Sequence, residues 1–283
     1  MTKFKLNSPY KESPDQKKAV EEIVQGIRGK DEKQTVLGVT GSGKTFVMAN
    51  IVNELNKPAL VISHNKTLAA QLYEEFKEFF PDNSIKYFVS YYDYYQPEAY
   101  LPAKDLYIEK ESQVNKEIEN LRFGAMNSAI TRRDTIVVAS VSCIYNIGNP
   151  DNYENKSVAF FIGQEIEISD LARELVSMRY TRDSMDFTNG VFRIAGDIIE
   201  IFPPYEEFSV RIEMWGNKVE NISKVHPLSK QKISDLKEIL IFPAASLIYS
   251  QDVIKVAVEN IKKDLEKRVN FLKNIGKDIE AYR

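Results

Sequence analysis

The chain reads Gly38-Val39-Thr40-Gly41-Ser42-Gly43-Lys44-Thr45 directly after the short apolar run 35–37. This octapeptide matches the complete phosphate-loop pattern G-x-x-x-x-G-K-[ST]. Its glycines let consecutive backbone N–H groups converge on phosphate oxygens, and Lys44 supplies a positive charge for the β- and γ-phosphates. The Thr45 hydroxyl is a ligand for Mg²⁺. A chance match occurs in on the order of one chain in a hundred of this length, so the pattern predicts a site for ATP and Mg²⁺.

Apolar runs and helical periodicities alternate around this loop. Helices are predicted at 44–55 and 66–79, because apolar residues recur there at helical spacing. Strands are predicted at 35–37, 58–63, 85–89 and 135–140. Alternation of this kind is typical of an α/β fold with a parallel sheet covered on both faces. We expect this domain to occupy residues 1–155.

Tyr10 and Gln16 precede the loop and are candidates for adenine recognition. The Gln16 amide can donate and accept at the N6/N7 edge of the base, and the Tyr10 ring can stack on it. A second interpretation is an ordinary helix start, with Ser13 as N-cap, Pro14 at the first helical position and Asp15 in the first turn. The two interpretations are compatible.

The catalytic set of an ATPase is incomplete in this sequence. Phosphate-loop ATPases position Mg²⁺ and water with a carboxylate at the end of an apolar strand. The only Asp-Glu pair, Asp31-Glu32, lies on a polar stretch before the loop. We therefore expect the chain to bind ATP without hydrolysing it efficiently.

Seven of the 15 tyrosines fall between Tyr87 and Tyr107. The adjacent pairs Tyr91-Tyr92 and Tyr94-Tyr95 place aromatic rings on both faces of any strand, and Pro97 excludes a central strand. The pattern favours a protruding hairpin whose rings stack on nucleic-acid bases, which is a sequence-tolerant mode of recognition. A tyrosine-rich protein interface is the alternative.

The pattern changes after about residue 155. A helix at 170–178 is followed by short strands at hairpin spacing, 191–194 with 198–202 and 210–214 with 218–222. We expect a small α+β domain at 156–245. From about 252 one apolar stripe predicts a single long helix, on the order of 45 Å, that needs a covering partner. Its members are Ile254, Val258, Ile261, Leu265, Val269, Leu272 and Ile279.

Composition limits the function further. The net charge of −3 excludes a general basic field, so any contact with DNA must be local. Cys143 is the single cysteine, which excludes an internal disulfide. It follows an apolar run that predicts a buried position, and a reactive thiol is the alternative. The N-terminal residues lack an apolar targeting core, and no run reaches 18 apolar residues. We expect a soluble, cytoplasmic protein with no membrane contact.

Four stretches resemble the UvrB family, whose members verify damage in bacterial nucleotide excision repair. They are LGVTGSGKTF at 37–46, NKTLAAQLY at 65–73, YFVSYYDYYQPEAY at 87–100 and RRDTIVVASVSCIYNIG at 132–148. The resemblance implies a P-loop (RecA/helicase-like) domain with a DNA-binding β-hairpin inserted at 91–114. It also implies a domain at 156–245 that docks UvrA, and a return to the helicase-like core at 246–283.

The resemblance also assigns residues and partners. Damaged double-stranded DNA would contact the hairpin tyrosines Tyr91, Tyr92, Tyr94, Tyr95, Tyr100 and Tyr107. UvrA would contact Arg182, Arg193, Arg211 and Glu213. Ala195 departs from the family, because many relatives carry an arginine there. The second helicase half, the Mg²⁺-binding carboxylates and the helices that recruit UvrC are absent, so the chain resembles an N-terminal fragment.

Two other functions compete with damage recognition. A non-catalytic module that docks UvrA, like the UvrB-like region of the transcription-repair coupling factor, would need neither a phosphate loop nor the tyrosine segment. A general P-loop translocase would not need the tyrosine segment. Both features of the sequence therefore favour an ATP-binding subunit that recognises DNA damage.

Overall fold

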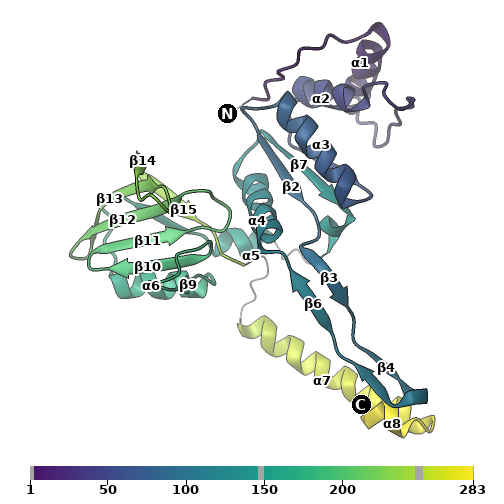
Figure 1. Ribbon diagram of the computed structural model, residues 1–283, viewed down its shortest axis with the longest axis vertical. Coiled ribbons are helices and arrows are strands. Elements are labelled where there is room, and N and C mark those ends of the chain that lie inside the picture. Colours follow the sequence, from purple (N-terminus) through teal and green to yellow (C-terminus); the bar gives the residue numbers. More distant parts are fainter. Residues whose placement is uncertain (1–2, 146–149, 246–250, 283) are drawn as a thin grey trace.

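Figure 1 shows the computed structural model, which describes residues 3–145, 150–245 and 251–282. The end of the stretch 132–148 and the beginning of the segment 246–283 lie outside the described residues. The helices are α1 Pro14–Arg28, α2 Lys44–Leu55, α3 Lys66–Phe79, α4 Lys116–Thr131, α5 Pro150–Asn155, α6 Ile168–Ser177, α7 Gln251–Asn274 and α8 Asp278–Tyr282, with the 3-10 turns η1 Pro102–Lys104 and η2 Val141–Ile144. The strands are β1 Ala59–Ser63, β2 Ser84–Phe88, β3 Tyr92–Gln96, β4 Ala99–Leu101, β5 Leu106–Ile108, β6 Glu111–Val114, β7 Thr135–Ser140, β8 Val158–Phe161, β9 Thr181–Arg182, β10 Val191–Ala195, β11 Ile198–Phe202, β12 Ser209–Trp215, β13 Lys218–Val225, β14 Lys232–Leu236 and β15 Glu238–Ile241.

The N-terminal part is a mixed α/β unit around a three-stranded parallel sheet in the order β1-β7-β2. On one face, α2 and α3 contribute Ala49, Ala69 and Phe76 to a core with Ile136 and Val138 of β7. On the other face, α4 packs Ala125 against Phe88 and Ala139. The predicted helices 44–55 and 66–79 are confirmed with the same bounds, because apolar periodicity is a local signal.

The predicted strand 35–37 is wrong. These residues form no strand, and Val36 and Leu37 are 42% and 92% exposed. A strand requires a hydrogen-bonding neighbour, and the described sheet ends at β1. Leu60 and Ile62 of that edge strand are themselves 57% and 56% exposed. The predicted strand 85–89 begins one residue earlier, at Ser84.

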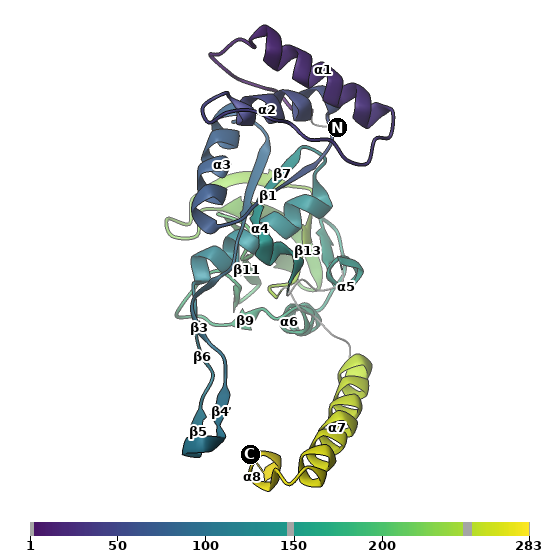
Figure 2. The ribbon, with the colours of Figure 1, turned by 90° about the vertical axis from the view of Figure 1, so that its right-hand side faces the viewer.

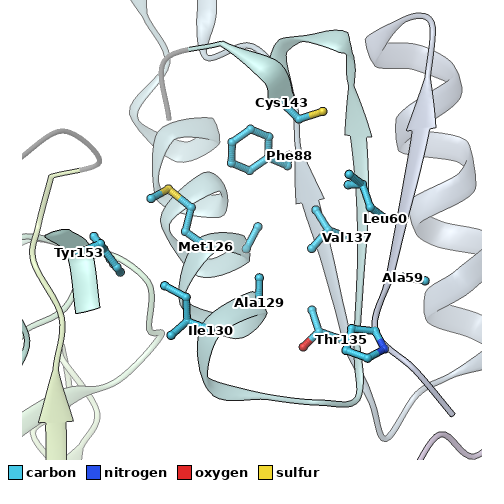
Figure 3. A pocket seen from close by; sticks show the side chains of 12 residues that line it. Ala59, Leu60, Phe88, Met126, Ala129, Ile130, Thr135, Val137, Cys143 and Tyr153 are labelled. Atoms are coloured by element: carbon cyan, nitrogen blue, oxygen red, sulfur yellow. The ribbon is translucent and has the colours of Figure 1, made fainter. Parts of the chain in front are cut away.

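An apolar cavity of about 390 Å³ lies where the sheet face next to β1 is incompletely covered. Figure 3 shows Leu60 and Val137 of the sheet facing Met126 and Ile130 of α4 across it. Cys143, predicted to be buried, is only half-buried and lines this cavity. The covering expected on both faces of the sheet is therefore incomplete on this side.

A long hairpin leaves the sheet after β2. The part of the hairpin next to the sheet pairs β3 with β6, and the tip pairs β4 with β5, both antiparallel. Figures 1 and 2 show it extending away from the sheet in the same direction as α7, opposite to α1 and α2. The chain returns through α4, which Asn115 caps by accepting a hydrogen bond from the Ile118 amide at 3.1 Å. The hairpin predicted at 91–114 is thus present.

The residues after 155 build a six-stranded sheet in the order β14-β13-β12-β11-β10-β9. All neighbours are antiparallel except β9 and β10, and the two predicted hairpins are β10–β11 and β12–β13. α6, predicted at 170–178, packs Leu171 and Leu175 against Phe192 and Ile199 on one face of this sheet. The α+β architecture expected from the sequence is confirmed.

The C-terminal segment is two helices rather than the one that was predicted. α7 ends at Asn274, and the chain turns at Gly276, whose φ of +74° favours glycine, before α8 begins. α7 is about 36 Å long at 1.5 Å per residue. Its apolar stripe is largely exposed, with Ile261 and Leu265 at 65% and 61%. None of the described helices is long and apolar enough to cross a membrane.

Candidate functional site

The phosphate loop leads into α2 through a backbone shape that depends on glycine. Gly43 caps the helix with a φ of +76°, and a Cβ there would lie 2.6 Å from the Gln16 Nε2 atom. α2 begins at Lys44, so its unpaired N–H groups and positive dipole end point toward the loop. This arrangement suits an anion, and residues 38–41 in front of it are exposed.

The Lys44 ammonium is held by the loop itself. Its Nζ donates to the carbonyl oxygens of Gly38 and Val39 at 3.0 and 2.8 Å. Both acceptors are neutral and exposed, so phosphate oxygens can compete for the ammonium with charge-assisted hydrogen bonds. Thr45 follows in the first turn of α2 and is half-buried. Lys44 and Thr45 are thus the first two residues of α2, next to the loop.

The structure brings Gln16 to the loop. The Gln16 Nε2 donates to the Ser42 carbonyl at 3.0 Å, while its Oε1 accepts from the Ser13 amide at 3.0 Å. Each contact uses one of two donors or two lone pairs of the amide, so capacity for a base remains. The helix start at Ser13 is a complete capping box, which confirms the second interpretation of this segment.

Tyr10 lies beside α2. Its ring is 69% exposed and meets Phe46 of α2 edge-on, with 6.4 Å between the ring centroids. The predicted nucleotide residues are thus gathered around the start of α2. Within the described part of the chain, no group of three or more His, Cys, Asp or Glu residues is placed to hold a metal ion.

The base of the hairpin is organised by a buried arginine. Arg122 of α4 donates from Nη1 to the Val89 carbonyl at 2.8 Å, and its guanidinium lies 3.9 Å from the centre of the Phe88 ring. The Tyr91 ring is 5.0 Å from the same guanidinium and 4.6 Å from the Tyr92 ring. A hydrogen bond with Tyr92 raises the pKa of Tyr91 to about 12. Tyr91 and Tyr92 are half-buried and pack against each other next to this arginine.

Further out, the hairpin presents exposed tyrosine rings. Tyr94, Tyr95 and Tyr107 are 45%, 50% and 48% exposed. Tyr94 and Tyr95 are consecutive in β3, so their side chains leave on opposite faces of the ribbon. Tyr100 is half-buried and donates to the Asp105 carboxylate at 2.8 Å, directly opposite Tyr107. The six predicted tyrosines thus divide into an inner, packed pair and an outer set along the hairpin.

The four predicted UvrA-contacting residues do not form one cluster. Arg193 of β10 and Arg211 of β12 lie on the two strands that flank β11. Both contact the buried Glu200 carboxylate of β11. Glu213 follows on β12 and accepts from the Asn221 amide at 3.4 Å. Arg182 is exposed on the edge strand β9, in register with Phe192 rather than with Arg193. Because paired residues share a face of a sheet, Arg182 lies on the face of Phe192, opposite to the face that carries Arg193.

Three residues that hold these groups in place were not predicted from the sequence. Arg122 contacts Val89 across 33 positions, and Glu200 contacts Arg211 across 11. Lys66 is a third case, since its Nζ donates to the Tyr92 carbonyl at 3.0 Å. No local signal marks such residues, because a charged residue within a helix or strand normally predicts a solvent-facing position.

Two family models match the chain. The model described as "Type III restriction enzyme, res subunit" matches residues 9–161, which is more than half of the chain. The model described as "UvrB interaction domain" matches residues 158–247. The two matches meet near the start of β8, where the parallel α/β unit gives way to the second sheet.

Curated relatives match along nearly the whole chain. The UvrABC system protein B of Methanosphaera stadtmanae is 50% identical over 283 residues, which cover 100% of this chain and 44% of that protein. The protein of the same name from Methanobrevibacter smithii is 51% identical over 283 residues, covering 100% and 43%. That of Staphylococcus aureus strain MSSA476 is 47% identical over 281 residues, covering 99% and 42%. The chain therefore spans less than half the length of these relatives.

Proposed function

The chain belongs to the UvrB family, and we propose that it is the ATP-binding, DNA-contacting and UvrA-docking part of a damage-recognition subunit of nucleotide excision repair. The observation that carries this proposal is a tyrosine-rich hairpin that continues directly from a strand of a phosphate-loop unit. We assign residues 1–155 to a P-loop helicase-like domain with the hairpin inserted at 91–114. Residues 156–245 form the docking domain, and 246–283 return to the helicase-like core. Acting on chromosomal DNA would locate the protein in the cytoplasm.

Nucleotide binding rests on residues 38–45. The backbone N–H groups of the loop and of the first turn of α2 would hold the phosphates, and Lys44 would move from the Gly38 and Val39 carbonyls to phosphate oxygens. Gln16 and Tyr10 would contact the adenine. Thr45 would hold Mg²⁺, which supplies charge neutralisation at the phosphates when it is bound.

Hydrolysis would require residues outside this chain. The relatives are more than twice as long, and the edge strand β1 leaves Leu60 and Ile62 exposed. Leu37 beside the loop is 92% exposed as well. These exposures support a further apolar strand between β1 and residues 35–37, ending in the carboxylates that hydrolysis needs. UvrC would likewise contact regions that this chain does not contain.

DNA binding would use the hairpin. Tyr94, Tyr95 and Tyr107 have exposed rings that could stack on bases, and Tyr100 lies opposite Tyr107. Tyr91 and Tyr92 would form the fixed inner end of the same site, next to Arg122. Because stacking tolerates any base, such a hairpin is suited to probing a strand of damaged double-stranded DNA for distortion rather than for sequence.

UvrA docking would use the second sheet. The face that carries Arg193, Arg211 and Glu213 lies opposite the α6-covered core, and Arg182 adds an exposed charge at the edge of the sheet. Charged groups at such a surface act mainly on association and specificity.

The test of nucleotide binding is Lys44→Ala, compared with Lys33→Ala, an exposed lysine just before the loop. Titration with a fluorescent ATP analogue and Mg²⁺ should give at least a tenfold weaker Kd for Lys44→Ala, because a charged hydrogen bond contributes about 1.5–3 kcal/mol. Lys33→Ala should bind like the wild type. Equal Kd values for all three proteins would contradict the phosphate-loop assignment and favour a pure docking module.

A further inference from the structure

A buried carboxylate lies on the face of the six-stranded sheet opposite to α6. Glu200 of β11 is 4% exposed, and both of its carboxylate oxygens have cationic partners. Oε1 accepts from Arg211, from Nε at 3.1 Å and from Nη2 at 2.8 Å. Oε2 accepts from Arg193 Nε at 2.5 Å and is 3.9 Å from the Lys230 Nζ. The two arginines come from the strands on either side of Glu200.

An aromatic ring completes the cluster. Phe187 lies beneath the Arg193 guanidinium at 4.5 Å and beneath the Lys230 ammonium at 4.3 Å, measured to the ring centroid. Its own ring meets Phe202 with 5.8 Å between centroids. Cations over a ring face are attracted by its quadrupole. Arg193 is therefore held from two sides, by a carboxylate and by a ring.

The charges of this cluster do not cancel. Three cationic side chains surround one anion, and the Lys230 Nζ is buried without a hydrogen-bond partner. Burial lowers the pKa of Lys230, Glu200 opposes this shift, and the nearby Arg193 and Arg211 charges add to it. One carboxylate is shared among three cations, so the cluster keeps a net positive charge, and an arrangement that only stabilised the fold would gain from matched charges. The surplus of positive charge instead suits a negatively charged partner.

The arginines remain accessible to such a partner. The Arg193 and Arg211 side chains keep 27% and 26% exposure, although Glu200 beneath them keeps only 5%. A guanidinium has five N–H donors in a rigid fork, and Glu200 engages only part of each fork. The donors that remain on a guanidinium held in this way are already oriented for a carboxylate.

We propose that Glu200 is a positioning residue, which fixes Arg193 and Arg211 as a pair that receives carboxylates from an acidic surface of the docking partner. This inference rests on the proposed docking function and adds to it the chemistry of the partner's surface. Glu200 itself touches no partner. Its contribution is that the two long side chains are ordered before binding, so that less conformational entropy is lost on association.

Charge and positioning predict opposite effects for Glu200→Gln. The substitution removes a negative charge from a cationic patch, so charge alone predicts tighter binding to an acidic surface and a steeper dependence on salt. Positioning predicts weaker binding and a shallower dependence, because two loosened arginines make fewer ionic contacts. Ordering two such side chains changes affinity by about tenfold, so the two cases are separable.

The experiment measures the Kd of the 283-residue chain for purified UvrA from the same genome across a series of salt concentrations. The variants are Glu200→Gln, Arg193→Ala, Arg211→Ala and the double variant Glu200→Gln with Arg193→Ala. The control is Glu220→Gln, which removes an exposed carboxylate from β13 of the same sheet. Thermal melting of each protein verifies that it is folded at the assay temperature.

We expect Glu200→Gln to bind about tenfold more weakly with a reduced salt slope, and Glu220→Gln to bind like the wild type. The double variant should be weaker than Arg193→Ala alone, but by a smaller factor than Glu200→Gln costs in the wild type, because Glu200 then has only Arg211 to position. Glu200→Gln binding as tightly as the wild type, while the arginine variants are impaired, would overturn the positioning role and leave docking intact. A wild-type chain that does not bind UvrA would instead refute the docking function.

A second variant covers the case in which Glu200→Gln does not fold. Phe187→Leu preserves every charge of the cluster and removes only the ring beneath Arg193 and Lys230. We expect several-fold weaker binding to UvrA with a melting temperature that still permits the assay. Wild-type affinity in the folded Phe187→Leu protein would also count against a positioned arginine pair.

Discussion

Replacing Tyr94 and Tyr95 together by alanine tests whether the hairpin binds DNA by stacking. The two rings are 45% and 50% exposed, on opposite faces of β3. Tyr94 donates to the Gln96 side chain at 2.7 Å, and the Tyr95 ring lies 5.5 Å from Tyr92. These are contacts along an exposed ribbon rather than core packing, so truncation should cost on the order of 1 kcal/mol of stability. A buried aromatic would cost about 3–5 kcal/mol.

The effect on DNA binding should be much larger. Each stacked ring contributes about 1–3 kcal/mol, so the loss of two rings amounts to at least about 2 kcal/mol. Since 1.4 kcal/mol corresponds to a factor of ten, binding to damaged DNA should weaken at least tenfold. Tyr145→Ala is the matched control, because that ring is 63% exposed and lies outside the hairpin.

The assay combines thermal melting with loading onto a duplex that contains a lesion. Loading is measured by fluorescence anisotropy in the presence of UvrA and ATP, with the chain extended to the full length of its relatives. We expect normal melting, normal nucleotide binding and lost loading for the double variant. A large fall in melting temperature would assign the two rings to structure. Normal melting with normal loading would remove them from the DNA site and leave Tyr91, Tyr92 and Tyr100 as candidates.

Three further predictions concern catalysis, docking and pH. The 283-residue chain should hydrolyse ATP about a thousandfold more slowly than a full-length relative, because it lacks groups that stabilise the transition state; comparable turnover in a phosphate-release assay would contradict this. Arg182→Glu should weaken UvrA binding more at low salt than at high salt, because the side chain is exposed; a salt-independent effect in a titration series would exclude a role in steering. Although burial opposes it, hydrogen bonds from Arg211 and Arg193 lower the pKa of Glu200 below its ordinary 4.5, so its stabilising contribution is present above pH 4.5 and is lost as the pH falls through the lowered value. The melting temperature should therefore fall less between pH 6 and pH 3 in Glu200→Gln than in Glu220→Gln, and parallel curves would contradict the assignment.

Local patterns in the sequence were sufficient for much of the fold. The helices α2 and α3 were predicted with their observed bounds, because apolar periodicity and the residues that begin and end a helix are neighbours in the chain. The tyrosine hairpin and the two hairpins of the second sheet were predicted for the same reason. α4 received no prediction. Its buried positions include Arg122, Gly124 and Ser128, which interrupt the apolar stripe.

The sequence by itself thus determined three features. They are the phosphate-loop motif, the excess of tyrosine in one segment and the change from a parallel to an antiparallel strand pattern. Tertiary structure alone decided the state of residues 35–37, because a strand exists only where a neighbour supplies hydrogen bonds. Tertiary structure also decided which charged side chains form ion pairs within the molecule. Arg193 and Arg211 read as two surface charges in the sequence, yet both hold Glu200, and only the pairing of three strands brings these side chains within hydrogen-bond distance. Contacts between residues far apart in sequence have no local signature, and the two arginines are matched to one carboxylate only after the sheet has formed.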